Sequence, residues 1–203
     1  MESRVLYVNA CVRQESRTRS LAEKLLEKLG GTYEEVCLEA QKAGKAYEEV
    51  RLEDIAFPVA NEEFLKKRDR LIAEGAFEDP MFALARQFAE ANVIVIAAPY
   101  WDLSFPAMLK QYLEQVNVVG ITFKYSEEGI PIGLCKAGRI YYVTTAGGPF
   151  APDAFGFGYV QALAQNYYGI RDVRKIEALG LDIVGADVEA IMKEAEDSLA
   201  ELC

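Results

Sequence analysis

The sequence predicts an α/β protein in which a parallel, doubly wound, five-stranded sheet carries helices on both faces. Strand-like apolar runs alternate with segments of helical periodicity along the chain, which is the pattern of such sheets. The run VIVIAAP at 93–99 is apolar without interruption, as expected for a parallel strand buried on both faces. No stretch rich in Gly, Pro and Ser divides the 203 residues, so we expect a single domain over residues 1–203.

The alternation begins at the start of the chain. Residues 4–10 (RVLYVNA) predict a strand, and after a polar loop a helix follows, which Gly30-Gly31 ends. The leucines on one face of that helix are Leu21, Leu25, Leu26 and Leu29. The segment YEEVCLE at 33–39 recurs as YEEVRLE at 47–53. Either copy suits the second strand, and we favour the later one because its loop leads directly into a helical stretch.

The middle of the chain continues the pattern. Residues 62–91 predict helix with interruptions at Gly75 and at Asp79-Pro80, and the buried strand at 93–99 follows. The next helix is expected from near Ser104, with Pro106 in its first turn, where the missing N–H does no harm. The stretch ITFKYSEEGIPIGL that comes next is a long connection with a turn at Glu128-Gly129.

The last third of the chain predicts the remaining two strands. RIYYVTT at 139–145 is the fourth strand, and residues 172–179 are the fifth. A helix is expected over 153–168, and a closing helix with one apolar face over 188–202.

Composition excludes several classes of function. With 22 Lys plus Arg against 32 Asp plus Glu, the net charge is −10, so we expect no nucleic-acid partner. The chain has no histidine, which excludes a nucleophile activated by histidine and removes the commonest ligand of a metal site, so no metal is expected. No apolar run approaches the roughly 20 residues that span a bilayer. Four widely spaced cysteines without a secretory signal favour reduced thiols in a cytoplasmic protein.

A loop after the first strand carries groups that suit a phosphate. Ser16, Arg17 and Thr18 stand just before a helix, where free backbone N–H groups and the helix dipole favour anions. The alternative is that Ser16 or Thr18 merely caps the helix and that the arginines are solvated. The loop has neither GxGxxG nor GxxxxGK[ST], so nothing in it indicates a dinucleotide fold or a nucleotide triphosphatase.

Two further loops follow predicted strands, and in such folds ligands bind at the carboxyl ends of strands. Residues PYWDL at 99–103 place the only Trp beside a Tyr, so that the rings either line a flat ligand or fold back on the core. Residues TAGGPF at 145–150 supply two glycines, which either admit a ligand close to the backbone or make a plain turn. Together the three loops indicate a site for a phosphorylated, planar cofactor.

Residues 93–148 carry a distinctive series of motifs: a strand ending in AAP, the aromatic loop, an LKQY helix, a GITFKY connection and a TTAGG turn. This series resembles the flavodoxin-like FMN-dependent NAD(P)H:quinone oxidoreductases, and especially the FMN-dependent NADH-azoreductases. The resemblance spans essentially the whole chain and is weakest over residues 30–80. It implies a flavodoxin-like flavin-binding domain with FMN as cofactor, NADH or NADPH as electron donor, and a quinone, azo compound or similar aromatic acceptor.

The resemblance also implies roles for individual positions. The implied cofactor-binding residues are Ser16, Arg17 and Thr18 at the phosphate, Pro99, Tyr100, Trp101, Asp102 and Leu103 beside the isoalloxazine ring, and Thr145, Ala146, Gly147 and Gly148 in the second flavin loop. Three positions depart from the family pattern: Ala10 replaces a serine, Asp102 an asparagine, and Ala146 a polar residue. A charged Asp102 near the ring would disfavour anionic reduced flavin and lower its potential.

The expected mechanism needs no catalytic side chain, because the flavin carries the chemistry. Both substrates would need the same face of the ring, so we expect ping-pong kinetics. The resemblance further implies a homodimer with flavin sites at its interface, which Phe123, Tyr125 and Phe150 reach unless they pack on their own subunit.

Other functions remain open at this level. One is an NADPH-dependent FMN reductase that releases reduced flavin, another a flavodoxin-type electron carrier, and a third a flavin-binding sensor. The sequence leaves undecided the physiological acceptor, the choice between NADH and NADPH, and whether Cys11 is redox-active.

Overall fold

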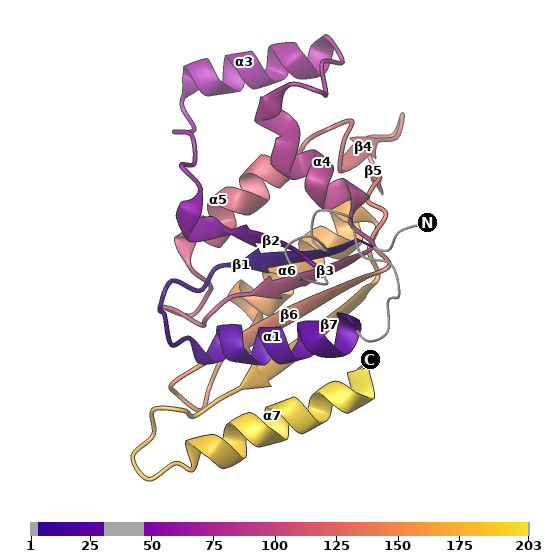
Figure 1. Ribbon diagram of the computed structural model, residues 1–203. Helices are drawn as coiled ribbons and strands as arrows, with labels where there is room; N and C mark the ends of the chain where they lie inside the picture. Colours follow the sequence, from indigo (N-terminus) through magenta and orange to yellow (C-terminus); the bar gives the residue numbers. More distant parts are fainter. Residues whose placement is uncertain (1–3, 31–46, 203) are drawn as a thin grey trace.

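A computed structural model describes residues 4–30 and 47–202. Its main sheet contains five parallel strands in the order β2-β1-β3-β6-β7 (Figure 1). The strands are β1 (Val5–Asn9), β2 (Glu48–Arg51), β3 (Val93–Ala97), β6 (Arg139–Thr145) and β7 (Asp172–Ala178). β2 lies on one side of β1, and β3, β6 and β7 follow in turn on the other side. This reversal of the strand order between β1 and β3 confirms the predicted parallel, doubly wound sheet.

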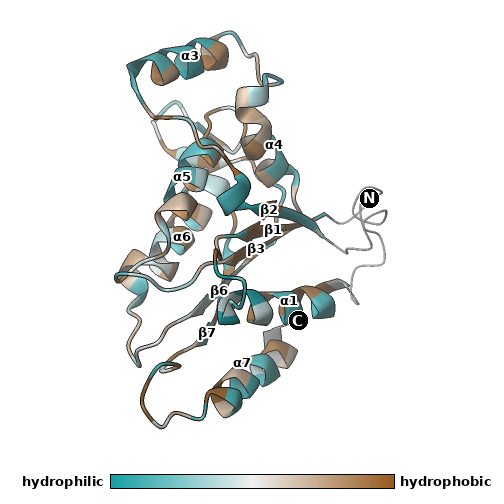
Figure 2. Ribbon diagram, turned by 60° about the vertical axis from the view of Figure 1, so that its left-hand side comes forward, coloured by the Kyte–Doolittle hydropathy of each residue, from teal (hydrophilic) through white to brown (hydrophobic). Residues whose placement is uncertain are grey.

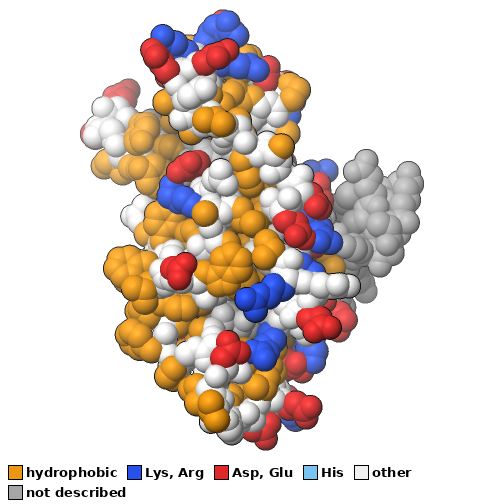
Figure 3. Space-filling model, turned by 90° about the vertical axis from the view of Figure 1, so that its left-hand side faces the viewer, with side chains coloured by type: hydrophobic (Ala, Val, Ile, Leu, Met, Phe, Trp, Pro, Cys, Tyr) orange, Lys and Arg blue, Asp and Glu red, His pale blue; other side chains and the backbone are white. Residues whose placement is uncertain are grey.

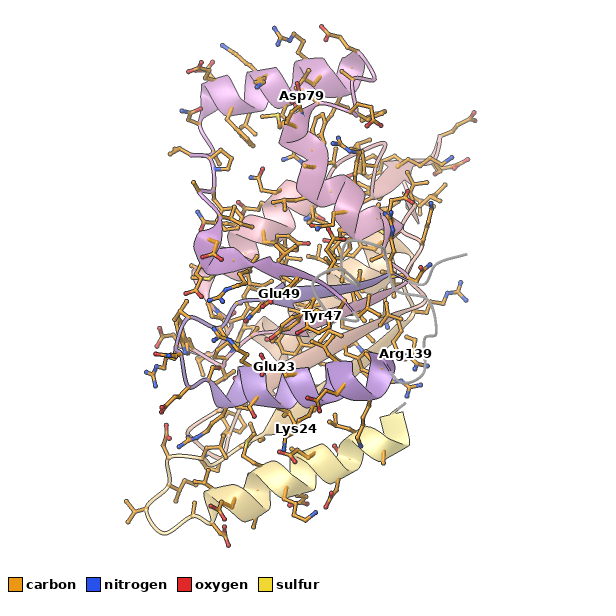
Figure 4. The ribbon with its side chains drawn as sticks, viewed as in Figure 1. Glu23, Lys24, Tyr47, Glu49, Asp79 and Arg139 are labelled. Atoms are coloured by element: carbon orange, nitrogen blue, oxygen red, sulfur yellow. The ribbon has the colours of Figure 1, made fainter. Side chains whose placement is uncertain are left out.

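Helices cover both faces of the sheet. On one face lie α1 (Arg17–Gly30) and α7 (Val188–Leu202), and on the other lie α4 (Ala83–Glu90), α5 (Ala107–Val116) and α6 (Phe157–Leu163) (Figures 1 and 2). An ion pair between Lys24 and Glu196 joins α1 to α7, and Figure 4 shows Lys24 between these two helices. Helix α3 (Glu62–Ala73) projects beyond α4 and buries only Leu71 (Figure 1).

Burial on both faces explains why the sequences of the central strands β1 and β3 are almost entirely apolar. All five residues of β1 and of β3 are buried. Tyr7 and Val95 pack with α1 and α7, whereas Val8 and Ile96, one position further on, pack with α4 and α5. Because each face of these strands meets its own helical layer, they are apolar except near the end of β1, where the buried Asn9 donates to Glu49 and accepts from the N–H of Cys11. The expectation of a strand buried on both faces is confirmed.

The structure corrects two predicted helices. Helix α5 begins at Ala107 and not near Ser104, because the N–H of Ser104 donates to the carbonyl of Trp101 in a tight turn and Pro106 is extended. The helix expected over 153–168 is divided into a 3₁₀ turn (Asp153–Phe155), α6 and a π-helical turn (Ala164–Tyr168).

The structure also shows what the later copy of the duplicated segment and the long connection form. The later copy of the repeat forms β2, as predicted, and the earlier copy lies outside the described residues. The long connection contains an antiparallel hairpin of β4 (Phe123–Tyr125) and β5 (Pro131–Gly133). This hairpin lies at the amino-terminal edge of the main sheet, the edge at which Arg139 begins β6 in Figure 4. None of the described helices has the length and apolar character required to cross a bilayer.

Candidate functional site

A cavity of about 560 Å³ opens at the carboxyl-terminal edge of the sheet. The loops after β1, β3, β6 and β7 line it, and Figure 3 looks onto this edge, where hydrophobic side chains gather beside arginine and acidic groups. The predicted site residues that line the cavity are Ser16, Arg17, Thr18, Pro99, Tyr100, Trp101, Thr145, Ala146 and Gly147. Three separately predicted loops therefore meet in one place, within the size range of small-molecule sites.

In the loop after β1, the sequence left open whether Ser16 or Thr18 caps the helix or whether the turn suits a phosphate. The structure is consistent with both. Ser16 caps α1, because its Oγ accepts a hydrogen bond of 3.2 Å from the N–H of Arg19. The N–H groups of Arg17 and Thr18 precede the first helical hydrogen bond and have no acceptor within the helix. Arg19 does not face the cavity, since its guanidinium donates to the carbonyl of Cys11 at 2.5 Å. Positive charge therefore reaches the cavity from Arg13 and Arg17.

Hydrogen bonds join the three loops to each other. The hydroxyls of Thr18 and Thr145 lie 2.6 Å apart, which links the first turn of α1 to the end of β6. The carbonyl of Thr145 accepts a 3.0 Å hydrogen bond from the N–H of Tyr100, which links β6 to the aromatic loop. Thr145, in the glycine loop, thus forms hydrogen bonds with both of the other loops.

The aromatic loop is a tight turn. Trp101 and Ser104 exchange two backbone hydrogen bonds, of 2.9 and 2.8 Å, and the two residues between them have positive φ: 48° at Asp102 and 70° at Leu103. This backbone is that of a type I′ turn, which normally takes Asn-Gly. The turn sets the ring of Trp101 in the cavity wall, whereas Asp102 and Leu103 lie outside the lining.

The glycine loop after β6 is the third loop of the cavity. It is held by a fourth loop, the one after β7, which the sequence analysis did not single out. The N–H groups of Leu181 and Asp182, after β7, donate to the carbonyls of Ala146 and Gly147 at 3.2 and 3.0 Å. A Cβ on Gly147 would lie 2.3 Å from Oδ2 of Asp182, so a larger residue there would have to displace that carboxylate. Gly148 lies outside the lining, and its carbonyl accepts from the N–H of Gly180.

Five cavity residues lie outside the predicted set of cofactor-binding residues, namely Val12, Arg13, Glu15, Leu181 and Asp182, although the charge of Arg13 was part of the phosphate argument. The first three flank the predicted phosphate loop and follow from its position. Leu181 and Asp182 have no motif of their own. The available signal was the strand order, because the loop after the fifth strand lies beside the loop after the fourth only if the two strands are neighbours.

The three aromatic residues predicted at a substrate site or interface lie outside the cavity. Phe123 is buried in its own chain, with its ring 4.6 Å from that of Tyr167 and 5.5 Å from that of Tyr125. It begins the hairpin at the opposite edge of the sheet. Tyr125 and Phe150 are 49% and 72% exposed, so their rings lie open to solvent or to another molecule.

A larger cavity, of about 740 Å³, lies beneath α3. Its lining is mainly aliphatic and aromatic, with Phe57, Phe64 and Met81 among its residues, and Lys67 is its only cationic side chain. Asn61, Glu63 and Phe64 place the start of α3 in its lining, but it has a single strand-end loop, the one after β2, and one cationic side chain. The smaller edge cavity is therefore the better candidate for a phosphorylated ligand. Within residues 4–30 and 47–202, no group of three or more potential ligands is placed to hold a metal ion.

Comparisons with known proteins agree with this architecture. A family model described as the flavodoxin-like fold matches residues 3–202. The chain belongs to this flavodoxin-like family. Two curated relatives are an FMN-dependent NADH:quinone oxidoreductase 2 of Clostridium acetobutylicum, 34% identical over 98% of this chain and 97% of its own, and an FMN-dependent NADH:quinone oxidoreductase of Lachnoclostridium phytofermentans, 35% identical over 96% and 95%.

Solved structures show the same fold at lower sequence similarity. An azoreductase from Bacillus anthracis superposes on this flavodoxin-like protein with a TM-score of 0.79 at 23% identity, covering 98% of each chain. An FMN-dependent NADH-azoreductase of the same species, solved in complex with FMN, has a TM-score of 0.75 at 23% identity. The family resemblance inferred from residues 93–148 is confirmed.

Proposed function

We propose that this flavodoxin-like protein is an FMN-dependent NAD(P)H:quinone oxidoreductase, with quinones, azo compounds or similar aromatic molecules as acceptors. The observation that carries the proposal is the convergence of the phosphate-suited, aromatic and glycine loops on one edge cavity. The relatives that share about a third of its residues over nearly their full length carry this activity in their names.

The residues of the cavity fit FMN. The free N–H groups at the first turn of α1, with the guanidinium of Arg17, would hold the phosphate. Trp101 and the ring of Tyr100 would border the isoalloxazine ring. Within the described part of the chain, the N–H groups of Gly147 and Gly148 have no hydrogen-bond acceptor, so they are available to a carbonyl or ring nitrogen of the flavin. When bound, FMN supplies the two-electron hydride chemistry.

The protein's part in the reaction is to position and to stabilise charge. The aromatic loop after β3 and the glycine loop after β6 form walls of the cavity. These walls would hold donor and acceptor in turn against the ring, near contact distance. The N–H of Gly147, which lines the cavity, would stabilise negative charge on the reduced ring. We propose ping-pong kinetics, because donor and acceptor would use the same open side of the cavity. Parallel initial-rate lines are expected, and intersecting lines would contradict this.

A homodimer is the assembly that we propose. Large apolar side chains are exposed on and just after the hairpin, namely Tyr125, Ile130, Ile132 and Leu134, and Phe150 and Phe155 are exposed in the segment after β6. Such exposed residues are expected where a second chain covers them. Light scattering should give about twice the 22.6 kDa of one chain, and a mass near that of one chain would refute the dimer.

We propose the cytoplasm as the compartment of the protein, since Cys11 and Cys135, the two described cysteines, are both free.

One experiment tests the enzymatic proposal. The protein is incubated with FMN and desalted, its visible absorption spectrum is recorded, and NADH or NADPH is then added without air. Retained flavin absorption that bleaches with the nicotinamide supports the proposal. Retained flavin that neither donor bleaches would point to an electron carrier and contradict it. Loss of flavin on desalting, with turnover of free FMN, would identify a flavin reductase instead.

A further inference from the structure

Arg17, the cationic residue at the phosphate-suited turn, is already paired within the chain. Its Nη1 lies 2.9 Å from Oδ1 of Asp182 and 3.4 Å from the carbonyl oxygen of Leu181. Asp182 comes from the loop after β7, 165 residues further along the chain. The ion pair thus links the first and fourth loops of the cavity, both of which line it.

Asp182 has little freedom to withdraw along the chain. Its N–H donates to the carbonyl of Gly147, and the preceding N–H donates to the carbonyl of Ala146. Its carboxylate lies so close to Gly147 that a Cβ there would be 2.3 Å from Oδ2. If the backbone stays in place, the carboxylate can leave Arg17 only by a rotation of its own side chain, and it then remains near the phosphate-suited turn.

We propose that Asp182 is an internal competitor for Arg17, which lowers the affinity of the site for the phosphorylated flavin without lowering its affinity for an unphosphorylated one. The inference rests on the proposed function, because it takes FMN as the ligand of this cavity. Asp182 thereby sets how strongly the protein prefers FMN to riboflavin, and how firmly FMN is retained.

The charges decide the direction of the effect. A phosphate monoester carries about −1.5 to −2 charges at neutral pH and competes for the same guanidinium donors as a carboxylate. Arg17 and Asp182 have side chains 44% and 73% exposed, so their pair is weak enough to exchange. Once displaced, the carboxylate would remain beside the same turn and repel a phosphate bound there. Riboflavin has no phosphate, so neither the exchange nor the repulsion affects it.

The test compares FMN and riboflavin on the flavin-free protein. Dissociation constants are measured by quenching of flavin fluorescence at low salt for the wild type and for Asp182→Asn. Asparagine keeps the size and an acceptor oxygen but loses the charge. We expect Asp182→Asn to bind FMN about tenfold more tightly, and riboflavin within about twofold of the wild type. The gain should shrink with added salt.

Two further variants make the result specific. Glu189→Gln removes one negative charge from an exposed position on α7 and should leave both constants unchanged. In an Arg17→Gln background, Asp182→Asn should lose the part of its effect on FMN that comes from competition for the guanidinium and keep only the part that comes from charge repulsion. The inference is wrong if Asp182→Asn leaves FMN affinity unchanged or weakens it, if it tightens riboflavin equally, or if Glu189→Gln has the same effect.

A separate readout distinguishes failure of this inference from failure of the proposed function. Inorganic phosphate alone should raise the melting temperature of Asp182→Asn more than that of the wild type. If no variant binds either flavin, the proposed function fails, and the phosphate result still reports on the competition. An equal phosphate response in the two proteins overturns the competition itself.

Discussion

The hydroxyls of Thr18 and Thr145 lie 2.6 Å apart and connect two segments separated by 127 residues. Thr18 is almost fully buried, so water does not easily replace this contact. Because Thr145 also holds the aromatic loop through its carbonyl, one side-chain contact couples the phosphate-suited turn to the wall of the cavity.

Replacing either threonine should therefore cost stability, and the two losses should not add. Thr18→Val and Thr145→Val are each expected to lower the free energy of unfolding by about 0.5–1.5 kcal/mol. The double variant should lose less than the sum, with a coupling energy of about 0.5 kcal/mol or more. Urea denaturation of the four flavin-free proteins measures this coupling, and strict additivity would show that the hydroxyls do not interact.

The turn at Asp102-Leu103 holds a leucine at a φ of 70°, where non-glycine residues are strained. Leu103 is 54% exposed, so removing its side chain loses little packing. We expect Leu103→Gly to raise the free energy of unfolding by about 0.5–1 kcal/mol, and Leu103→Val to lower it by about 1 kcal/mol, because a β-branched residue tolerates this backbone least. Both variants shorten the side chain, so opposite signs in thermal unfolding isolate the backbone effect.

Asp102 lies in the same turn, beside the cavity and outside its lining. If FMN binds as proposed, a negative charge here opposes charge on the reduced ring. Asp102→Asn should raise the midpoint potential of the bound flavin, by on the order of 10–30 mV. Equilibration with reference dyes during slow reduction measures the shift. The charge control Glu189→Gln should leave the potential unchanged, and a fall in potential with Asp102→Asn would contradict the charge argument.

Thr144 and Thr122 are both buried threonines with opposite hydrogen bonding. Within the described residues, Oγ1 of Thr144 makes no hydrogen bond of good geometry and has only the hydroxyl of Tyr142 nearby, although the residue is 3% exposed. Oγ1 of Thr122 donates to the carbonyl of Val116 at 2.8 Å and accepts from the N–H of Val118 at 3.1 Å. Thr144→Val should raise the free energy of unfolding by about 0.5–1 kcal/mol, and Thr122→Val should lower it by about 1–3 kcal/mol. Urea unfolding checks both, and destabilisation by Thr144→Val would reveal a partner for its hydroxyl.

Cys11 lies against β3 behind the first loop, and burial is the main cause that raises the pKa of its thiol to about 11. The thiol is therefore protonated at about pH 8 and should not react with Ellman's reagent until the protein unfolds. In the unfolded chain the thiol ionises near its ordinary pKa of 9.0, so the native state holds its proton to higher pH. This contribution to stability is present below about pH 9 and is lost between about pH 9 and 11.

The variant Cys11→Ala isolates that pH dependence. It should flatten the fall in the free energy of unfolding between about pH 9 and 11, relative to the wild type. Rapid labelling of native Cys11 at about pH 8, in a background with Cys37, Cys135 and Cys203 replaced by serine, would contradict the assignment of a buried thiol and favour a redox role.

Sequence periodicity predicted the sheet well because burial on two faces leaves a strong mark. The strands at 93–99 and 139–145 were located almost to the residue, since β3 is buried throughout and β6 is buried at every position between its two ends. The start of α5 was predicted three residues early. Proline is acceptable in the first turn of a helix, and only the hydrogen bonds between Trp101 and Ser104 show that the chain turns there instead.

By itself the sequence determined the fold class, the family and the three loops of the cavity, because local patterns encode burial and turn chemistry directly. Only the tertiary structure decided what those loops meet. Ser16 caps a helix while Arg17 pairs with Asp182, and Phe123 is buried at the opposite edge of the sheet. The Arg17–Asp182 pair joins residues 165 positions apart, and the place of Phe123 depends on where its hairpin meets the sheet. Both depend on the order and register of the strands, which no local pattern specifies.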